Sequence, residues 1–155
     1  AYSPTSGYVY VYILQDDDGD AVGSQLEAAA PPLNPGGVLG DGNGDGLSDD
    51  TQSNVASLPV NSAGAAMLHN RGLQPLETGY ITLAVASQFE LRRVYPLPYP
   101  ASNPAQPANF EVFPFGFVGL EITSIPSGGS VDLLLYYPEV SLPDTVYAFG
   151  STPGD

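Results

Sequence analysis

Short runs of apolar, aromatic and β-branched residues recur along the chain, and clusters of turn-forming residues separate them. Val, Ile, Tyr and Phe favour extended backbone, so apolar runs of roughly four to eight residues bounded by Gly, Pro, Asn or Asp predict strands. We predict strands at residues 8–14, 54–58, 65–69, 80–87, 89–95, 110–113, 115–125, 130–137 and 145–149. About eight short strands at this spacing favour a β-sandwich.

Glycine and proline confine helix to one short segment. The chain holds 18 Gly and 16 Pro among 155 residues, and proline breaks helices while glycine weakens them. Residues 24–30 are compatible with about one or two helical turns before Pro31. The PSGG sequence at 126–129 predicts a hairpin-type turn, and the proline-rich stretch 96–107 predicts an exposed loop of polyproline character. These features place the chain in the all-β class.

The first predicted strand, at residues 8–14, has no polar face, which is typical of a strand buried on both sides. We therefore expect residues 1–20 to form an N-terminal strand segment, 21–40 a Gly/Pro/Ala-rich linker and 41–155 the sandwich domain. The strand either joins a neighbour's sheet by donor-strand complementation or folds back into its own sandwich. Head-to-tail donation does not close on itself and therefore builds a filament.

The charge of the chain excludes several classes of function. The chain has 17 carboxylates, three arginines and no lysine, which gives a net charge of −14. Such a chain lacks the basic patch that nucleic acids require, and anionic membranes repel it. No apolar run approaches the roughly 20 residues of a membrane span, and the absence of cysteine excludes disulfides. The start at Ala1 without a Met favours an N-terminal export signal that has been removed or is not included in this sequence, and so a protein located outside the cell or on its surface.

The acidic loop at residues 41–49 has the spacing of a calcium loop. Oxygen-bearing side chains of Asp41, Asn43, Asp45 and Asp49 occupy positions 1, 3, 5 and 9, with glycine at position 6, where the chain must turn sharply. The carbonyl of Leu47 would supply the ligand at position 7, and its side chain would anchor the loop to the core. Calcium prefers about six to eight hard oxygen ligands, so these residues predict a Ca²⁺ site.

This loop departs from an EF-hand at position 12, where Gln52 replaces the bidentate glutamate. It is closer to the shorter loops of thrombospondin type 3 and dockerin-like modules, with Asp49 or Asp50 closing the shell. The second acidic stretch, 16–20, completes the same site, holds a second ion, or simply ends a strand with charge. The two stretches hold eight of the 17 carboxylates, so without a divalent cation they should repel one another and destabilise the fold.

The sequence contains no recognisable set of catalytic residues. The single histidine, His69, has no nucleophile motif and no zinc-ligating partners, so we interpret it as structural. Glu90, Glu111 and Glu121 lie in strand-like segments, where a carboxylate facing solvent is the simpler interpretation than a glycosidase pair. We expect no enzymatic activity.

The motifs from the calcium loop onward resemble, in their order, the choice-of-anchor U domain of bacterial surface proteins. The matching pieces are DGNGDGLSD at 41–49 with Gln52, NVASL at 54–58, GYITL at 79–83, FPFGF at 113–117, GGSV at 128–131, LYYP at 135–138, LP at 142–143 and VY at 146–147. The resemblance covers roughly residues 41–150. It implies an exported β-domain with variable anchoring, and it transfers no active site.

These observations favour a structural subunit of an extracellular fibre or surface layer that self-associates into a homopolymer. The alternative is a secreted adhesin or carbohydrate-binding module that uses calcium and the aromatic rings of Tyr95 and Tyr99 to bind glycans. A hydrolase fragment is the third interpretation, and the missing catalytic residues argue against it.

Overall fold

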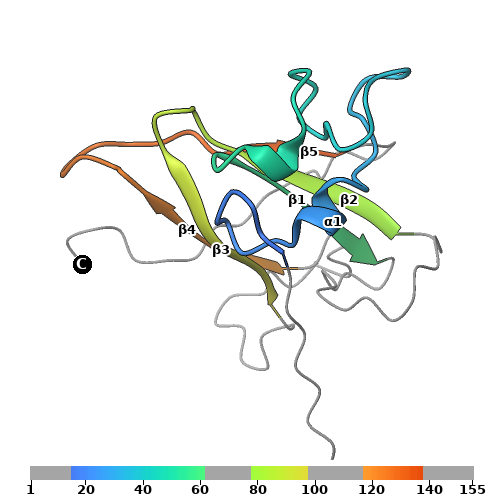
Figure 1. Ribbon diagram of the computed structural model, residues 1–155. Helices are drawn as coiled ribbons and strands as arrows, with labels where there is room; N and C mark the ends of the chain where they lie inside the picture. Colours follow the sequence, from blue (N-terminus) through green and yellow to red (C-terminus); the bar gives the residue numbers. More distant parts are fainter. Residues whose placement is uncertain (1–14, 62–77, 98–116, 138–155) are drawn as a thin grey trace, which may run out of the picture.

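The computed structural model of the chain describes residues 15–61, 78–97 and 117–137 (Figure 1). Several predicted features lie outside the described residues. They are the strands at 8–14, 65–69, 110–113 and 145–149, most of the loop at 96–107, and the side chains of His69, Tyr99 and Glu111.

The regular secondary structure of the described residues is mostly strand, with almost no helix. The elements are α1 (Ser24–Glu27), the 3-10 turn η1 (Asp49–Thr51), β1 (Val55–Asn61), β2 (Thr78–Ala84), β3 (Glu90–Leu97), β4 (Phe117–Thr123) and β5 (Leu134–Tyr136). One antiparallel sheet has the order β1-β2-β5, and β3 pairs with β4 in a second antiparallel sheet. The all-β class is therefore confirmed.

Local sequence located most of these elements. The strands β1 to β4 fall within or overlap the segments predicted at 54–58, 80–87, 89–95 and 115–125, and α1 is the short helical piece predicted at 24–30. The turn at 126–129 also forms, because the amide of Gly129 donates to the carbonyl of Pro126 at 2.8 Å. The hairpin prediction was wrong, however, since β4 and β5 pair in different sheets. Turn residues specify a chain reversal, whereas the pairing partner depends on distant segments.

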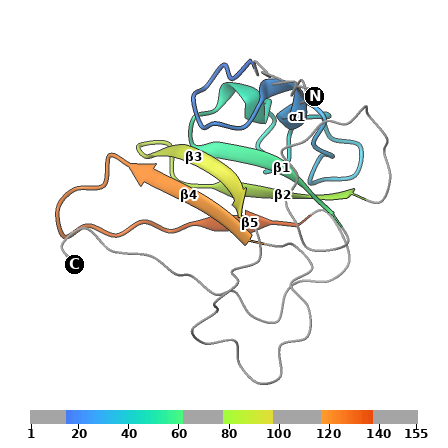
Figure 2. The same cartoon turned by 90° about the horizontal axis from the view of Figure 1, so that it is seen from below.

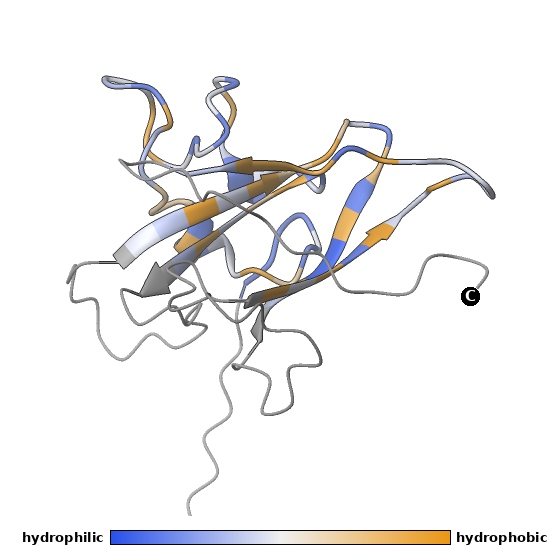
Figure 3. Cartoon of the chain, turned by 180° about the vertical axis from the view of Figure 1, so that it is seen from behind, coloured by the Kyte–Doolittle hydropathy of each residue, from blue (hydrophilic) through white to orange (hydrophobic). Residues whose placement is uncertain are grey.

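The hydrophobic core is shared by both sheets. Ala56 and Leu58 of β1, with Ile81 and Leu83 of β2, lie at alternate positions and so on one face of their sheet. The rest of the buried cluster comes from β3 and the flanking loops, with Val22, Val85, Leu91 and Val94. Its members are at most 5% exposed, and Figure 3 shows the corresponding hydrophobic segments of the strands.

Strand β3 buries two residues that are three positions apart, which a regular strand cannot do on one face. The pairing of β3 with β4 shifts register between Arg92 and Tyr95, and Arg93 has a φ of 50°. This irregularity is a β-bulge, which adds one residue to the strand and turns the following side chains over. As a result Leu91 and Val94 are both fully buried.

The opposite face of the β1–β2 pair is also buried. Val55, Ser57 and Thr82 are at most 3% exposed although they alternate with the core residues. Residues 15–54, which include α1 and η1, run without strands along this side of β1 and β2 (Figures 1 and 2). Both α1 and η1 contact β1 and each other. The same segment also reaches β3, because the amide of Val94 donates to the carbonyl of Asp20 at 2.8 Å.

Replacing Leu58 by alanine should destabilise the protein by about 2 to 5 kcal/mol. Leu58 is 1% exposed and packs in the core shared by the two sheets, so truncation removes apolar contacts and leaves a cavity. Urea denaturation followed by circular dichroism measures the loss. Leu39→Ala is the matched control, because Leu39 is 62% exposed and its truncation should cost less than about 0.5 kcal/mol. Equal effects of the two variants would contradict the observed core.

Candidate metal centre

Residues 16–21 form a tight loop that winds around the carboxylate of Asp16. Its Oδ1 accepts the amide of Gly19 at 2.7 Å, and its Oδ2 accepts the amide of Ala21 at 3.0 Å. The amide of Asp20 donates to Oδ1 of Asp18 at 3.4 Å. Short acidic side chains bond readily to backbone amides two or more residues ahead, which is why this sequence coils rather than extends.

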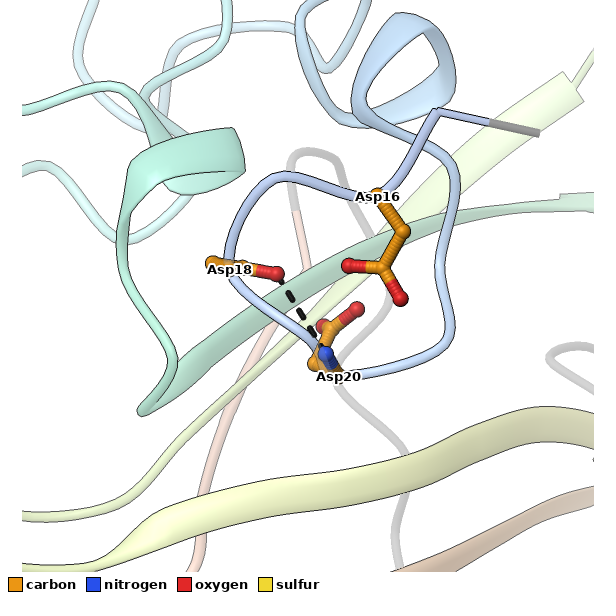
Figure 4. Close-up of side chains that lie close together, drawn as sticks. All are labelled: Asp16, Asp18 and Asp20. Atoms are coloured by element: carbon orange, nitrogen blue, oxygen red, sulfur yellow. Dashed lines mark hydrogen bonds between the residues drawn. The ribbon is translucent and has the colours of Figure 1, made fainter.

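The coiling brings three carboxylates together. Asp16, Asp18 and Asp20 each offer one oxygen, and these oxygens lie within 4.8 Å of one another. Figure 4 shows the three side chains pointing toward the interior of the loop. Asp16 is exposed, Asp18 is partly buried and Asp20 is fully buried. The burial of the side chains therefore increases along the loop from Asp16 to Asp20.

Glu27, the last residue of α1, is buried beside this group with 0% exposure. Its Oε1 accepts the amide of Ser57 on β1 at 3.2 Å. Its Oε2 has no hydrogen-bond partner, and neither has Oδ2 of Asp18 or Oδ2 of Asp20, although all three oxygens are buried. An unsatisfied buried polar atom is costly, so oxygens in this state require a physical explanation.

Burial raises the pKa of each of these carboxyls. Desolvation is the largest cause, and it raises the pKa of Asp18 to about 6 and that of Asp20 to about 7. The pKa of Glu27 rises to about 10, through desolvation first and then through the negative charges of Asp20 and Asp18. The three acids therefore form one electrostatic group that disfavours its own ionisation.

In the described part of the chain, neither arginine forms an ion pair with this group. Arg92 pairs with Glu90 at 2.8 Å and Arg93 with Glu121 at 3.4 Å, both at exposed positions on β3 and β4. Exposed pairs of this kind contribute little stability. The acidic stretches are therefore not neutralised by either of these arginines through a direct ion pair.

The loop predicted to bind calcium, residues 41–49, is organised around Asp41. The buried carboxylate of Asp41 accepts the amides of Gly44 at 2.8 Å and Asp45 at 3.0 Å on Oδ1, and that of Gly46 at 3.0 Å on Oδ2. The φ angle of Gly46 is 89°, in the region that glycine adopts without strain. Glycine at position 6 thus makes the sharp turn expected from the sequence.

Asp45 and Asn43 line the outer side of this loop. Oδ1 of Asp45 accepts the amide of Leu47 at 2.8 Å, and the Asn43 amide group donates to Oδ2 of Asp45 at 3.0 Å. The expectation that the Leu47 side chain anchors the loop to the core was wrong, because Leu47 is 59% exposed. The bonds to the Asp41 carboxylate fix the loop instead, so no apolar anchor is needed.

Asp49 ties this loop to the sheet. It is fully buried, and its Oδ2 accepts the amide of Gly42 at 2.9 Å and the hydroxyl of Ser57 at 2.5 Å, while its Oδ1 has no partner. Burial raises the pKa of Asp49, and the two hydrogen bonds oppose that rise. Gly42 packs so closely that a β-carbon there would lie 2.7 Å from the Ser57 hydroxyl oxygen.

Ser57 connects Glu27 of α1 with Asp49 of the second acidic stretch. Its amide binds Glu27 and its hydroxyl binds Asp49, and the hydroxyl also lies 2.5 Å from that of Thr82, its register partner on β2. In the ranges that the structure describes, the close group of three carboxylates is the one formed by residues 16, 18 and 20. Asp41, Asp45 and Asp49 lie outside that group, and the metal site predicted for them stays a prediction.

Glu27 was not among the site residues predicted from the sequence. The signal was available, because counting Asp16 as position 1 places Glu27 at position 12, where an EF-hand loop carries its glutamate. Alanine instead of glycine at position 6, and the interpretation of 21–40 as a linker, obscured the pattern. In the structure this segment packs on the sheet and contributes the fully buried Val22 to the core.

Comparisons with protein-family models, with curated proteins and with solved structures gave no match for this chain. None of the helices in residues 15–61, 78–97 and 117–137 is long and apolar enough to cross a membrane.

Proposed function

We propose that this chain is a non-catalytic, calcium-stabilised structural subunit of an extracellular fibre or surface assembly. The observation that carries the calcium part is a set of three fully buried carboxylates, two of which bond to Ser57 on β1. Asp20, Glu27 and Asp49 are each 0% exposed, and each has one oxygen without a hydrogen-bond partner. A bound cation would satisfy such oxygens and offset the cost of burying the charges.

The donors favour calcium over other metals. Carboxylate, amide and carbonyl oxygens are hard ligands that suit calcium, magnesium and manganese, whereas zinc and copper prefer nitrogen and sulfur. The chain has no cysteine and one histidine. Magnesium usually retains several waters, while calcium accepts many protein oxygens in irregular geometry, which suits loops of this kind.

A scaffold role without catalysis is consistent with what the described carboxylates contact. Asp16 and Asp41 accept backbone amides within their own loops, and Asp49 accepts Gly42 and Ser57. Glu90 and Glu121, which the sequence raised as hydrolase candidates, take part in exposed ion pairs with the arginines of β3. These contacts hold the chain in shape.

The assembly part of the proposal rests on sequence. We propose that the two sheets belong to a sandwich of about eight short strands, related to the choice-of-anchor U domain. The apolar strand at residues 8–14 would join the sheet of the next subunit and so build a homopolymer outside the cell.

Electron microscopy of the full chain tests this assembly. Filaments should form in calcium, shorten or disappear in chelator, and fail to form from a variant lacking residues 1–14. Thermal melts of the same samples show whether the shortened variant is still folded. Absence of filaments from the folded full chain in calcium, or unchanged filaments from the shortened variant, would overturn the donor-strand proposal.

A further inference from the structure

We propose that residues 16–27 form a complete calcium site of their own, in which Asp16, Asp18 and Asp20 supply side-chain oxygens and Glu27 closes the shell. This site is separate from the loop at 41–49. The inference deepens the calcium part of the proposed function and does not require that the chain assembles.

The spacing of these residues is that of a twelve-residue calcium loop. Such a loop uses side chains at positions 1, 3 and 5, a backbone carbonyl at 7, a residue at 9 that often acts through water, and a glutamate at 12. Asp16, Asp18, Asp20 and Glu27 occupy positions 1, 3, 5 and 12. The carbonyl at position 7 belongs to residue 22 and the side chain at position 9 to residue 24.

The backbone follows this spacing. Ala21, at the position where such loops carry glycine, has a φ of 79°, which is the left-handed conformation that glycine favours. The single turn α1 then begins at Ser24 and ends at Glu27. That turn brings position 12 back over the start of the loop.

Buried oxygens without partners indicate the ligand independently of the spacing. Asp20 and Glu27 are both 0% exposed, and Oδ2 of Asp20 and Oε2 of Glu27 have no hydrogen-bond partner. Oδ2 of Asp18, in the same loop, is likewise buried without a partner. A divalent cation among them would replace mutual repulsion with attraction.

Glu27 is also held in place for this role. The amide of Ser57 fixes its Oε1 at 3.2 Å, which leaves Oε2 for the cation and a second lone pair on Oε1 for bidentate binding. The amide of Ser24 donates to the carbonyl of Gln15 at 2.8 Å, and the Ser24 hydroxyl accepts the amide of Asp17 at 3.0 Å. The two ends of the loop are therefore joined before any ion binds.

Calcium titration of the full chain by isothermal calorimetry tests the site. The wild type should bind two ions. Glu27→Gln, which keeps the shape and removes the charge, should lose one of them or weaken it by roughly tenfold or more. Asp45→Asn should affect the other ion instead. Asp17→Asn is the matched control, because Asp17 lies in the same loop at position 2, is exposed and bonds only to Gln15 within the side-chain contacts described.

Melting curves of Glu27→Gln separate a ligand from a merely structural residue. Without metal, the variant should melt at a higher temperature than the wild type, because the wild-type carboxyl must either take up a proton or stay charged in a buried site, whereas the amide does neither. Adding calcium should raise the melting temperature of Glu27→Gln by less than it raises that of the wild type. The site would be overturned if calcium raised the melting temperature of Glu27→Gln as much as that of the wild type. It would also be overturned if Asp17→Asn reduced this calcium-dependent rise as much as Glu27→Gln does. Binding of one ion that only Asp45→Asn disturbs would do the same and leave the calcium-stabilised function intact, whereas no binding at all would contradict both.

Discussion

Removing calcium should lower the melting temperature of the full chain by about 10 °C. Each bound ion stabilises the folded state by about 1.4 to 2.7 kcal/mol when free calcium is about ten to one hundred times its Kd. Two ions therefore contribute about 3 to 5 kcal/mol, and each kcal/mol corresponds to about 2 to 4 °C for a chain of this size. The effect is large because Asp20, Glu27 and Asp49 are fully buried, and without a cation each must either stay charged in a desolvated site or take up a proton.

Circular dichroism melts in calcium, in chelator and after calcium is restored measure this effect. Restoring calcium should return the melting temperature to its starting value, and magnesium should restore it less well, because it dehydrates reluctantly and demands regular octahedral geometry. Sodium chloride at equal ionic strength controls for simple screening of the net charge of −14. A melting temperature that chelator leaves unchanged would contradict structural calcium at both loops.

The metal-free protein should become more stable on acidification, with its melting temperature rising by roughly 5 °C between about pH 8 and about pH 5. The folded-state pKa of Asp20 is about 7 against an ordinary value of 3.8, and that of Glu27 is about 10 against 4.5. At a pH between the ordinary and the folded-state pKa of such a group, the folded state binds more protons than the unfolded state. The free energy of unfolding therefore falls as pH rises. The contribution of these two groups to the free energy of unfolding is fully present below their unfolded-state pKa values. It is lost as pH rises through their folded-state pKa values.

In calcium the trend should reverse, because protons compete with the ion for the same oxygens. Protein freed of metal by dialysis is the appropriate sample, since chelators lose affinity in acid. Glu27→Gln should flatten the metal-free profile, because the titrating group with the highest raised pKa is gone. A metal-free melting temperature that falls steadily from about pH 8 to about pH 5 would count against the buried acidic group.

Local residue patterns were sufficient to predict much of the fold. The β-branched and aromatic runs located β1 to β4 because strand preference and flanking turn residues act over a few neighbouring positions. The sharp turn at Gly46 followed from the same kind of local chemistry, since glycine adopts positive φ at no steric cost. The all-β class needed only the counts of glycine and proline and the short apolar runs.

Pairing and burial required the tertiary structure. Nothing local to 126–129 specifies that β4 pairs with β3 while β5 pairs with β2, and the bulge at Arg93 upset the simple alternation by burying Leu91 and Val94 together. Sheet partners are chosen by contacts between residues far apart in the chain, which periodicity does not encode.

The acidic residues show the same difference between what local sequence predicts and what tertiary contacts decide. Sequence alone determined that the carboxylates gather in two stretches and that the second has calcium-loop spacing, because ligand positions are counted along the chain. Only the tertiary structure decided that Glu27 and Asp49 are fully buried and meet at Ser57 on β1. Burial depends on what packs above a side chain, and here residues 15–54 cover a strand that follows them in sequence.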